Sequence, residues 1–268
     1  MASLALPKNL NKSYIVCSTG RSGSTLLCKT LEKTGCCGKP QEYFHLQTME
    51  RLQIYKDSET FINYCNSILK EGLTEDGTFG IKMHWWQMYN FFKVARKFLD
   101  VSEKTDLEIL NYIFPNPNFI YIWRRDLTQQ AVSTVIALQT KQWAKPKQKE
   151  NKNNDKAKKI NDKLKFQPLK IYRWEQGFAD QNRRWREFLT DNNLDYREVV
   201  YEDFVANFDQ QITEVIDYLG VDQKTINDKI EPPLQRQASE INQKFLQRYK
   251  SIPKLVTKVA YKLNQKLN

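Results

Sequence analysis

The residues best suited to chemistry form a loop of small and hydroxyl side chains around one arginine: Gly20, Arg21, Ser22, Gly23, Ser24 and Thr25. An apolar, β-branched run (14–17) precedes this loop, and a helical pattern (25–33) follows it directly. A strand, a tight loop and a helix N-terminus point several backbone N–H groups at one place, where an anion binds well. The loop therefore predicts a phosphate-type site.

This loop differs from the Walker A motif, G-x-x-x-x-G-K-[ST], because no lysine follows its second glycine. Without that lysine and its magnesium-binding partner, the loop favours a phosphate-bearing donor that needs no metal. The alternative is a Gly/Ser turn beside an ordinary helix start. The chain has two histidines, and its five cysteines show no C-x-x-C spacing, so no metal-ligand pattern is present. The odd number and the spacing of the cysteines predict reduced thiols in a cytoplasmic protein.

A glutamate in the next loop is a candidate general base. Glu42 follows Pro40 and Gln41 and lies two residues before Phe44. A partly apolar setting of this kind raises the pKa of a carboxyl group towards that of a useful base. A surface glutamate beside a proline turn is the alternative.

A lysine and a histidine share an expected strand at 79–84. Lys82 and His84 alternate with apolar residues, so both side chains are predicted on the same side of the sheet. There they could bind an anion and transfer a proton, or be a solvated lysine and a histidine at the edge of the core. Trp85 and Trp86 follow as an aromatic patch that either packs against the next helix or forms a wall for a ligand.

A second charged corner follows the most apolar strand, at 118–123. Arg125 stands just after that strand, and Ser133 lies eight residues further along a helical pattern. The two could converge on a second phosphate group.

Alternating strands and helices predict one α/β domain over residues 1–268. We expect a P-loop-like, three-layer fold with a central parallel sheet flanked by helices and a helical insertion after the 119–123 strand.

The net charge of the chain is +11. Residues 144–165 hold nine lysines and three acidic residues and so account for +6 of this charge, and we interpret them as a mobile surface loop. No nucleic-acid partner is predicted. Residues 252–268 form an amphipathic basic helix, which either docks on its own domain or contacts a membrane surface.

Four blocks in order resemble the bacterial trehalose-2-sulfotransferase-like family of sulfotransferases, which use 3′-phosphoadenosine-5′-phosphosulfate (PAPS). They are G-R-S-G-S-T-L-L (20–27), K-P-Q-E-Y-F (39–44), R-R-D-L-T-Q-Q-A-V-S (124–133) and Q-R-Q-A (235–238). The resemblance implies that 21–25 cradles the 5′-phosphosulfate. It also implies that Arg125 and Ser133 hold the 3′-phosphate, that Arg236 and Gln237 close over it, and that no metal takes part.

The same resemblance leaves two candidate bases. Glu42 matches the carboxylate proposed as the base in this family, whereas Lys82-Met83-His84 resembles the K-x-H element of the broader cytosolic sulfotransferases, in which the histidine is the base. Family members that act on trehalose carry glutamine where this chain has Gly20, and this departure weighs against trehalose as the acceptor.

We therefore expect a PAPS-dependent sulfotransferase that releases 3′-phosphoadenosine-5′-phosphate (PAP). Arg21, Glu42, Lys82 and His84 would act in catalysis on a small-molecule, sugar or glycolipid acceptor. Residues 20, 40, 41, 44, 85 and 86 would line the acceptor site. The alternatives are an ATP-dependent P-loop-type kinase and a non-catalytic nucleotide-binding module. The resemblance also suggests a homodimer, because members of the family are often dimers.

Overall fold

The structure, a computed structural model, describes residues 3–143, 163–222, 231–233 and 240–267. The chain divides into two compact units, of which the first comprises Met1–Trp123 and Gln181–Glu231 and the second Arg124–Asp180 and Pro232–Asn268. Most of the lysine-rich segment, 144–162, and the predicted ligands Arg236 and Gln237 lie outside the described residues. The single domain predicted over 1–268 stays a prediction.

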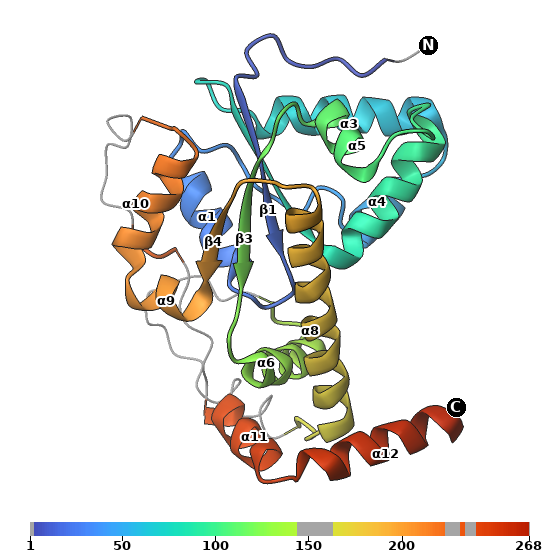
Figure 1. The fold of residues 1–268 in the computed structure, drawn as a ribbon, viewed down its shortest axis with the longest axis vertical. Coiled ribbons are helices and arrows are strands. Elements are labelled where there is room, and N and C mark those ends of the chain that lie inside the picture. The colour runs from blue at the N-terminus through green and yellow to red at the C-terminus, as the bar shows by residue number, and fades with distance from the viewer. Residues whose placement is uncertain (1–2, 144–162, 223–230, 234–239, 268) are drawn as a thin grey trace. The chain divides into compact units, whose positions relative to one another are not determined.

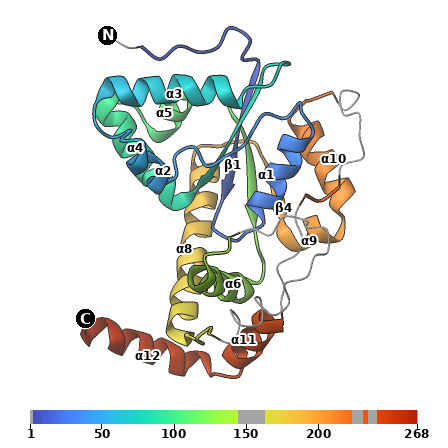
Figure 2. The same ribbon diagram turned by 180° about the vertical axis from the view of Figure 1, so that it is seen from behind.

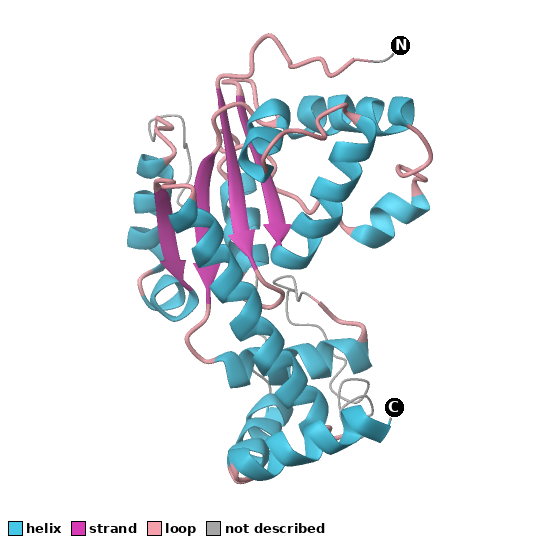
Figure 3. Ribbon diagram, turned by 45° about the vertical axis from the view of Figure 1, so that its right-hand side comes forward, coloured by secondary structure: helices cyan, strands magenta, loops and turns pink. Residues whose placement is uncertain are grey.

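The first unit is built on a parallel sheet in the order β2-β1-β3-β4. Its strands are β1 (Lys12–Ser18), β2 (Thr78–His84), β3 (Asn118–Trp123) and β4 (Tyr196–Val200). All three strand pairs are parallel, and Figure 3 shows the arrows pointing the same way. β1 and β2 are almost entirely buried, as expected for strands covered on both faces.

Helices cover both faces of this sheet (Figures 1 and 2). On one face pack α2 (Leu46–Arg51), α3 (Ser58–Gly72), α4 (Trp85–Phe98), α5 (Asp106–Ile113) and the C-terminal part of α8 (Pro168–Asp191). On the other pack α1 (Ser24–Lys33), α9 (Tyr201–Ala206) and α10 (Phe208–Tyr218).

Side-chain alternation along β1 explains these two cores. Ile15 and Cys17 face the larger core, whereas Tyr14 and Val16 face the core beneath α1 and α10. The three-layer α/β architecture with a central parallel sheet is therefore confirmed.

The described part of the second unit is helical and begins directly after β3, which confirms the predicted helical insertion. It contains α6 (Leu127–Thr140), the N-terminal part of α8, α11 (Glu240–Lys250) and α12 (Lys254–Leu267). Val132 and Val135 of α6 pack with Phe178 of α8 and Phe245 of α11 in a separate core. No helix within the described residues is long and apolar enough to cross a membrane.

Local contacts set the ends of several elements. The N-cap of α3 is Asp57, whose carboxylate accepts a hydrogen bond from the Thr60 N–H at 2.8 Å. Strand β4 ends at Val200 because Tyr201 begins α9. The six-residue α2 was not predicted, since a helix this short leaves little periodic pattern.

Gly23, which precedes α1, offers a test of the loop. Its φ of 94° is left-handed, and an added Cβ would lie 2.3 Å from the Tyr201 ring, whereas Gly35, with φ 78°, has nothing within 4 Å. Gly35→Ala is expected to lower the free energy of unfolding by about 1 to 2 kcal/mol, the cost of a left-handed alanine. Gly23→Ala should cost about 1 to 3 kcal/mol more, because overpacking adds to strain. Urea denaturation would measure both, and equal losses would contradict the packing of Tyr201 on this loop.

Candidate active site

The site lies where β1 and β2 end side by side. The parallel register pairs Ser18 with His84, the last residue of each strand. The carboxyl ends of parallel strands share one edge of the sheet, and ligands bind beyond that edge in open α/β folds. The glycine- and serine-rich loop therefore starts next to the end of the strand that carries Lys82 and His84.

The loop turns into α1 through two left-handed residues, Arg21 with φ 64° and Gly23 with φ 94°. Gly23 is the N-cap and has no side chain, so no side-chain cap occupies the start of α1. The first-turn N–H groups of a helix have no partner within it, and Ser24 and Thr25 stand at that turn. The Ser22 hydroxyl is fully buried and makes no hydrogen bond to the described residues. A buried donor of this kind suits a bound anion.

The loop that carries Glu42 is attached to the edge of β2. The Lys82 N–H donates to the Gln41 carbonyl at 3.0 Å, and Gln41 bridges to Ile81. The Gln41 side chain itself points away, since its Nε2 contacts Glu32 at 3.4 Å. This backbone attachment places the next residue, Glu42, over the side chains of β2.

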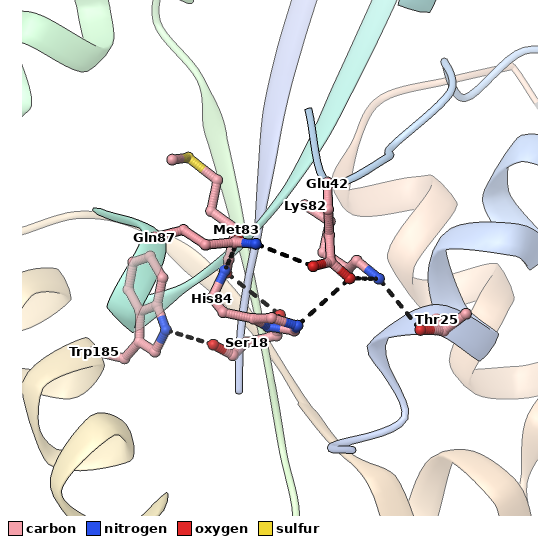
Figure 4. Close-up of polar contacts among 8 residues, drawn as sticks. All are labelled: Ser18, Thr25, Glu42, Lys82, Met83, His84, Gln87 and Trp185. Carbon is pink, nitrogen blue, oxygen red and sulfur yellow. Dashed lines mark hydrogen bonds and ion pairs between the residues drawn. The ribbon is translucent and has the colours of Figure 1, made fainter. Parts of the chain in front are cut away.

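Glu42, Lys82 and Thr25 form a continuous polar contact (Figure 4). Lys82 Nζ lies 2.8 Å from Glu42 Oε1 and donates to Thr25 Oγ1 at 3.2 Å. The Lys82 side chain is only 7% exposed and that of Glu42 is 26% exposed. A buried ammonium thus joins the carboxylate to the first turn of α1.

His84 approaches the same carboxylate from the end of β2. Its Nε2 lies 3.5 Å from Glu42 Oε1, and its Nδ1 lies 2.9 Å from Ser18 Oγ. Ser18 Oγ also donates to the Met83 carbonyl at 3.3 Å, so the serine links the histidine ring to the end of β2. Nε2 is therefore the ring nitrogen that faces the Glu42 carboxylate. Trp185 Nε1 donates to the Ser18 carbonyl at 2.8 Å and fixes the strand end.

Gln87 completes the network, and the sequence interpretation missed it. Its Nε2 donates to Glu42 Oε2 at 3.0 Å, and its Oε1 accepts from the His84 N–H at 2.7 Å. Gln87 is 1% exposed at the third position of α4, with His84 as the N-cap. The spacing of a capping box, in which a glutamine reaches back three residues, is the signal that could have found it.

This setting controls the charge of Glu42. Burial alone would raise the pKa of the carboxyl, but His84 and Lys82 outweigh that penalty and hold the pKa of Glu42 well below its ordinary value of 4.5. Glu42 is therefore a carboxylate at neutral pH. The raised pKa that its apolar neighbours suggested is wrong, because Lys82 and His84, which lower the pKa of Glu42, come from a strand distant in sequence.

The two tryptophans after His84 have different surroundings. Trp86 is 37% exposed, with its ring centroid 6.5 Å from that of His84 and 5.5 Å from that of His45. Trp85 instead packs edge-on against Trp185 at 5.0 Å. Trp86 is thus the one of the pair beside the Glu42 network.

Two other residues predicted to line the acceptor site are buried. Phe44 is 4% exposed and packs against Phe91 with ring centroids 4.6 Å apart, within the larger core. Pro40 is also buried. The Phe44 contacts anchor this loop to the larger core.

The predicted ligands of the second phosphate belong to the second unit. Arg125 is exposed just before α6, and Ser133 is 8% exposed within it. Asp126 caps this helix by accepting from the Gln129 N–H at 2.8 Å. The neighbouring Arg124 is buried and donates to the Gln129 side chain.

Comparison with known proteins indicates the family of this chain. The family model described as Stf0 sulphotransferase matches residues 13–251. The chain belongs to the Stf0 sulphotransferase family. The matched range includes β1 from Ser13 onward, the loop before α1 and all of the Glu42 network. This Stf0 family member is a sulfotransferase enzyme by descent.

Curated relatives of this Stf0 protein include two trehalose 2-sulfotransferases. That of Mycobacterium tuberculosis is 26% identical over 265 residues, covering 90% of this chain and 95% of the relative. That of Mycolicibacterium smegmatis is 26% identical over 264 residues, covering 89% and 94%. A solved sulfotransferase from Alicyclobacillus acidocaldarius matches with a TM-score of 0.47 and 13% identity, covering 90% of this chain and 92% of that one.

The low pKa of Glu42 predicts a pH-dependent loss of stability. Glu42→Gln should lower the free energy of unfolding by about 1 to 3 kcal/mol at neutral pH, since hydrogen bonds to charged groups contribute this much. Because the folded pKa lies below 4.5, ionised Glu42 stabilises the fold fully above that value, and this stabilisation declines as pH falls below it.

Urea unfolding of the wild type and Glu42→Gln should therefore differ by a constant amount above about pH 5.5 and by progressively less below pH 4.5. Glu50→Gln, at an exposed position, is the matched control. A difference that does not change with acid would argue against the ion pair.

Proposed function

We propose that this protein transfers a sulfuryl group from PAPS to a hydroxyl group, or an amine, of a sugar-type acceptor. The observation that carries the proposal is the position of Lys82, whose ammonium contacts both Glu42 and Thr25. A candidate base and a candidate phosphosulfate loop are thereby joined through one cation. General-base and electrostatic catalysis need these groups side by side.

The loop has the donors that a phosphosulfate needs. The buried Ser22 hydroxyl, the first-turn N–H groups at Ser24 and Thr25, and Arg21 can each donate to an anionic oxygen. PAPS would supply the activated sulfuryl group, with PAP as the product. Lys82 adds positive charge next to this loop, where it would balance negative charge that develops on the departing phosphate.

The acceptor must lose a proton as its oxygen attacks sulfur, and we propose the Glu42–His84 pair as the recipient. The carboxylate alone is a weak base because its pKa is held low. His84 Nε2 lies 3.5 Å away, so a proton taken by either group remains within hydrogen-bonding range of the other.

The 3′-phosphate ligands are proposed on the family resemblance. Arg125 and Ser133 would hold this phosphate, and Arg236 and Gln237 would close over it. Arginine suits the role because its planar guanidinium binds phosphate through two parallel hydrogen bonds.

A sugar-type acceptor is proposed because both curated relatives are trehalose 2-sulfotransferases. Trp86 offers an exposed aromatic face near His84 on which an apolar sugar face could stack. Gly20 stands where family members that act on trehalose carry a glutamine, so an acceptor other than trehalose is proposed. Cytoplasmic location is proposed with it, since PAPS is an intracellular donor.

A calorimetric titration with PAP, with and without Mg²⁺, tests the donor. We expect binding that is the same with and without the metal, and that weakens about tenfold in Arg125→Ala, the effect of one lost charged hydrogen bond. Ser102→Ala, an exposed serine, is the control. Binding of ATP with Mg²⁺ in preference to PAP would support a kinase instead.

Transfer from labelled PAPS to a panel of sugars, trehalose included, tests the base. Glu42→Gln and His84→Gln should each lower turnover about 10²- to 10⁴-fold while PAP binding stays near that of the wild type. If one variant keeps normal turnover and the other loses it, the residue replaced in the inactive variant is the base alone. If both bind PAP and both turn over normally, the proton is taken elsewhere.

A further inference from the structure

The C-terminal helix α12 exposes a row of apolar side chains that the proposed reaction does not use. Leu255 is 71% exposed, Val256 56%, Val259 48% and Leu263 56%. At about 100° per residue, these four positions fall within one arc of about 100° around the helix. A contiguous row of exposed apolar side chains of this kind marks a surface that binds another molecule or a membrane.

The opposite side of α12 is the side that packs on the second unit. Thr257 is 3% exposed, and the Tyr261 ring lies 5.3 Å from that of Tyr172 in the N-terminal part of α8. Docking of α12 on its own unit therefore accounts for one face and leaves the apolar row pointing outward. Figure 1 shows this helix in red at the end of the chain.

Three exposed lysines form a strip between these two faces. Lys254, Lys258 and Lys262 recur every four residues, so they lie along one edge of the apolar row. The sequence of α12 contains no aspartate or glutamate. Lysine stems can lie along an apolar surface while their ammonium groups reach a neighbouring polar layer.

We propose that α12 binds the surface of an anionic lipid bilayer. The row of Leu255, Val256, Val259 and Leu263 enters the outer part of the acyl layer, and the lysine strip contacts headgroup phosphates. An anionic bilayer offers both an apolar layer and negative charge next to it, which matches the two adjacent strips. Pairing of α12 with the α12 of a second copy is less favourable. It would bring the lysines of both helices together, and α12 contains no acidic residue to neutralise them.

Flotation of the full-length protein with lipid vesicles tests this proposal. We expect it to float with vesicles of phosphatidylcholine mixed with phosphatidylglycerol, and to remain in solution with phosphatidylcholine alone. Leu255→Gln with Leu263→Gln, and separately Lys258→Glu with Lys262→Glu, should each weaken the partition at least about tenfold. High salt should weaken that of the wild type.

The matched control replaces two exposed leucines outside α12, Leu6→Gln with Leu52→Gln, which should float like the wild type. Circular dichroism and thermal unfolding verify that each variant folds. Failure to bind anionic vesicles, or binding that survives both α12 variants, would overturn the proposal. A second outcome would also overturn it. In that outcome, sedimentation shows a dimer that dissociates only in the Leu255→Gln with Leu263→Gln variant, while the flotation of this variant stays unchanged.

Discussion

A lysine ammonium held between a carboxylate and the start of a helix is the interaction on which the rest of the site depends. An ammonium this deeply buried is tolerated only when partners replace its water. Lys82 finds them in Glu42 and in Thr25, which come from different segments of the chain. The need to neutralise one buried charge thus brings β2, the loop after Pro40 and α1 to a single place.

Parallel pairing makes this convergence possible. Because β1 and β2 run the same way and in register, the loop before α1 and the end of β2 lie at one edge of the sheet. The site therefore inherits its geometry from backbone hydrogen bonds and not from the side chains alone. In the Stf0 family member described here, Trp185 of α8 strengthens that edge by bonding the Ser18 carbonyl. Charged groups in a fixed frame need little reorganisation when a reaction begins.

Local patterns predicted most of the frame, and contacts between distant segments account for what they missed. The strand–loop–helix around Gly23 and the shared side of Lys82 and His84 follow from periodicity. The depressed pKa of Glu42 does not, because it depends on partners some forty residues away in sequence. The role of Gln87 does not follow from periodicity either, because the capping-box spacing identifies this residue only when the start of α4 is known.

The side-chain amide of Gln87 forms a hydrogen bond at each end. Its oxygen accepts from the backbone N–H of His84, and its nitrogen donates to Glu42. One side chain therefore connects the first turn of α4 to the carboxylate. A backbone amide is protected from exchange with solvent as long as its hydrogen bond holds. The exchange rate of the His84 amide proton with deuterium would therefore report how often its bond to Gln87 opens, at the point where α4 joins the charged network.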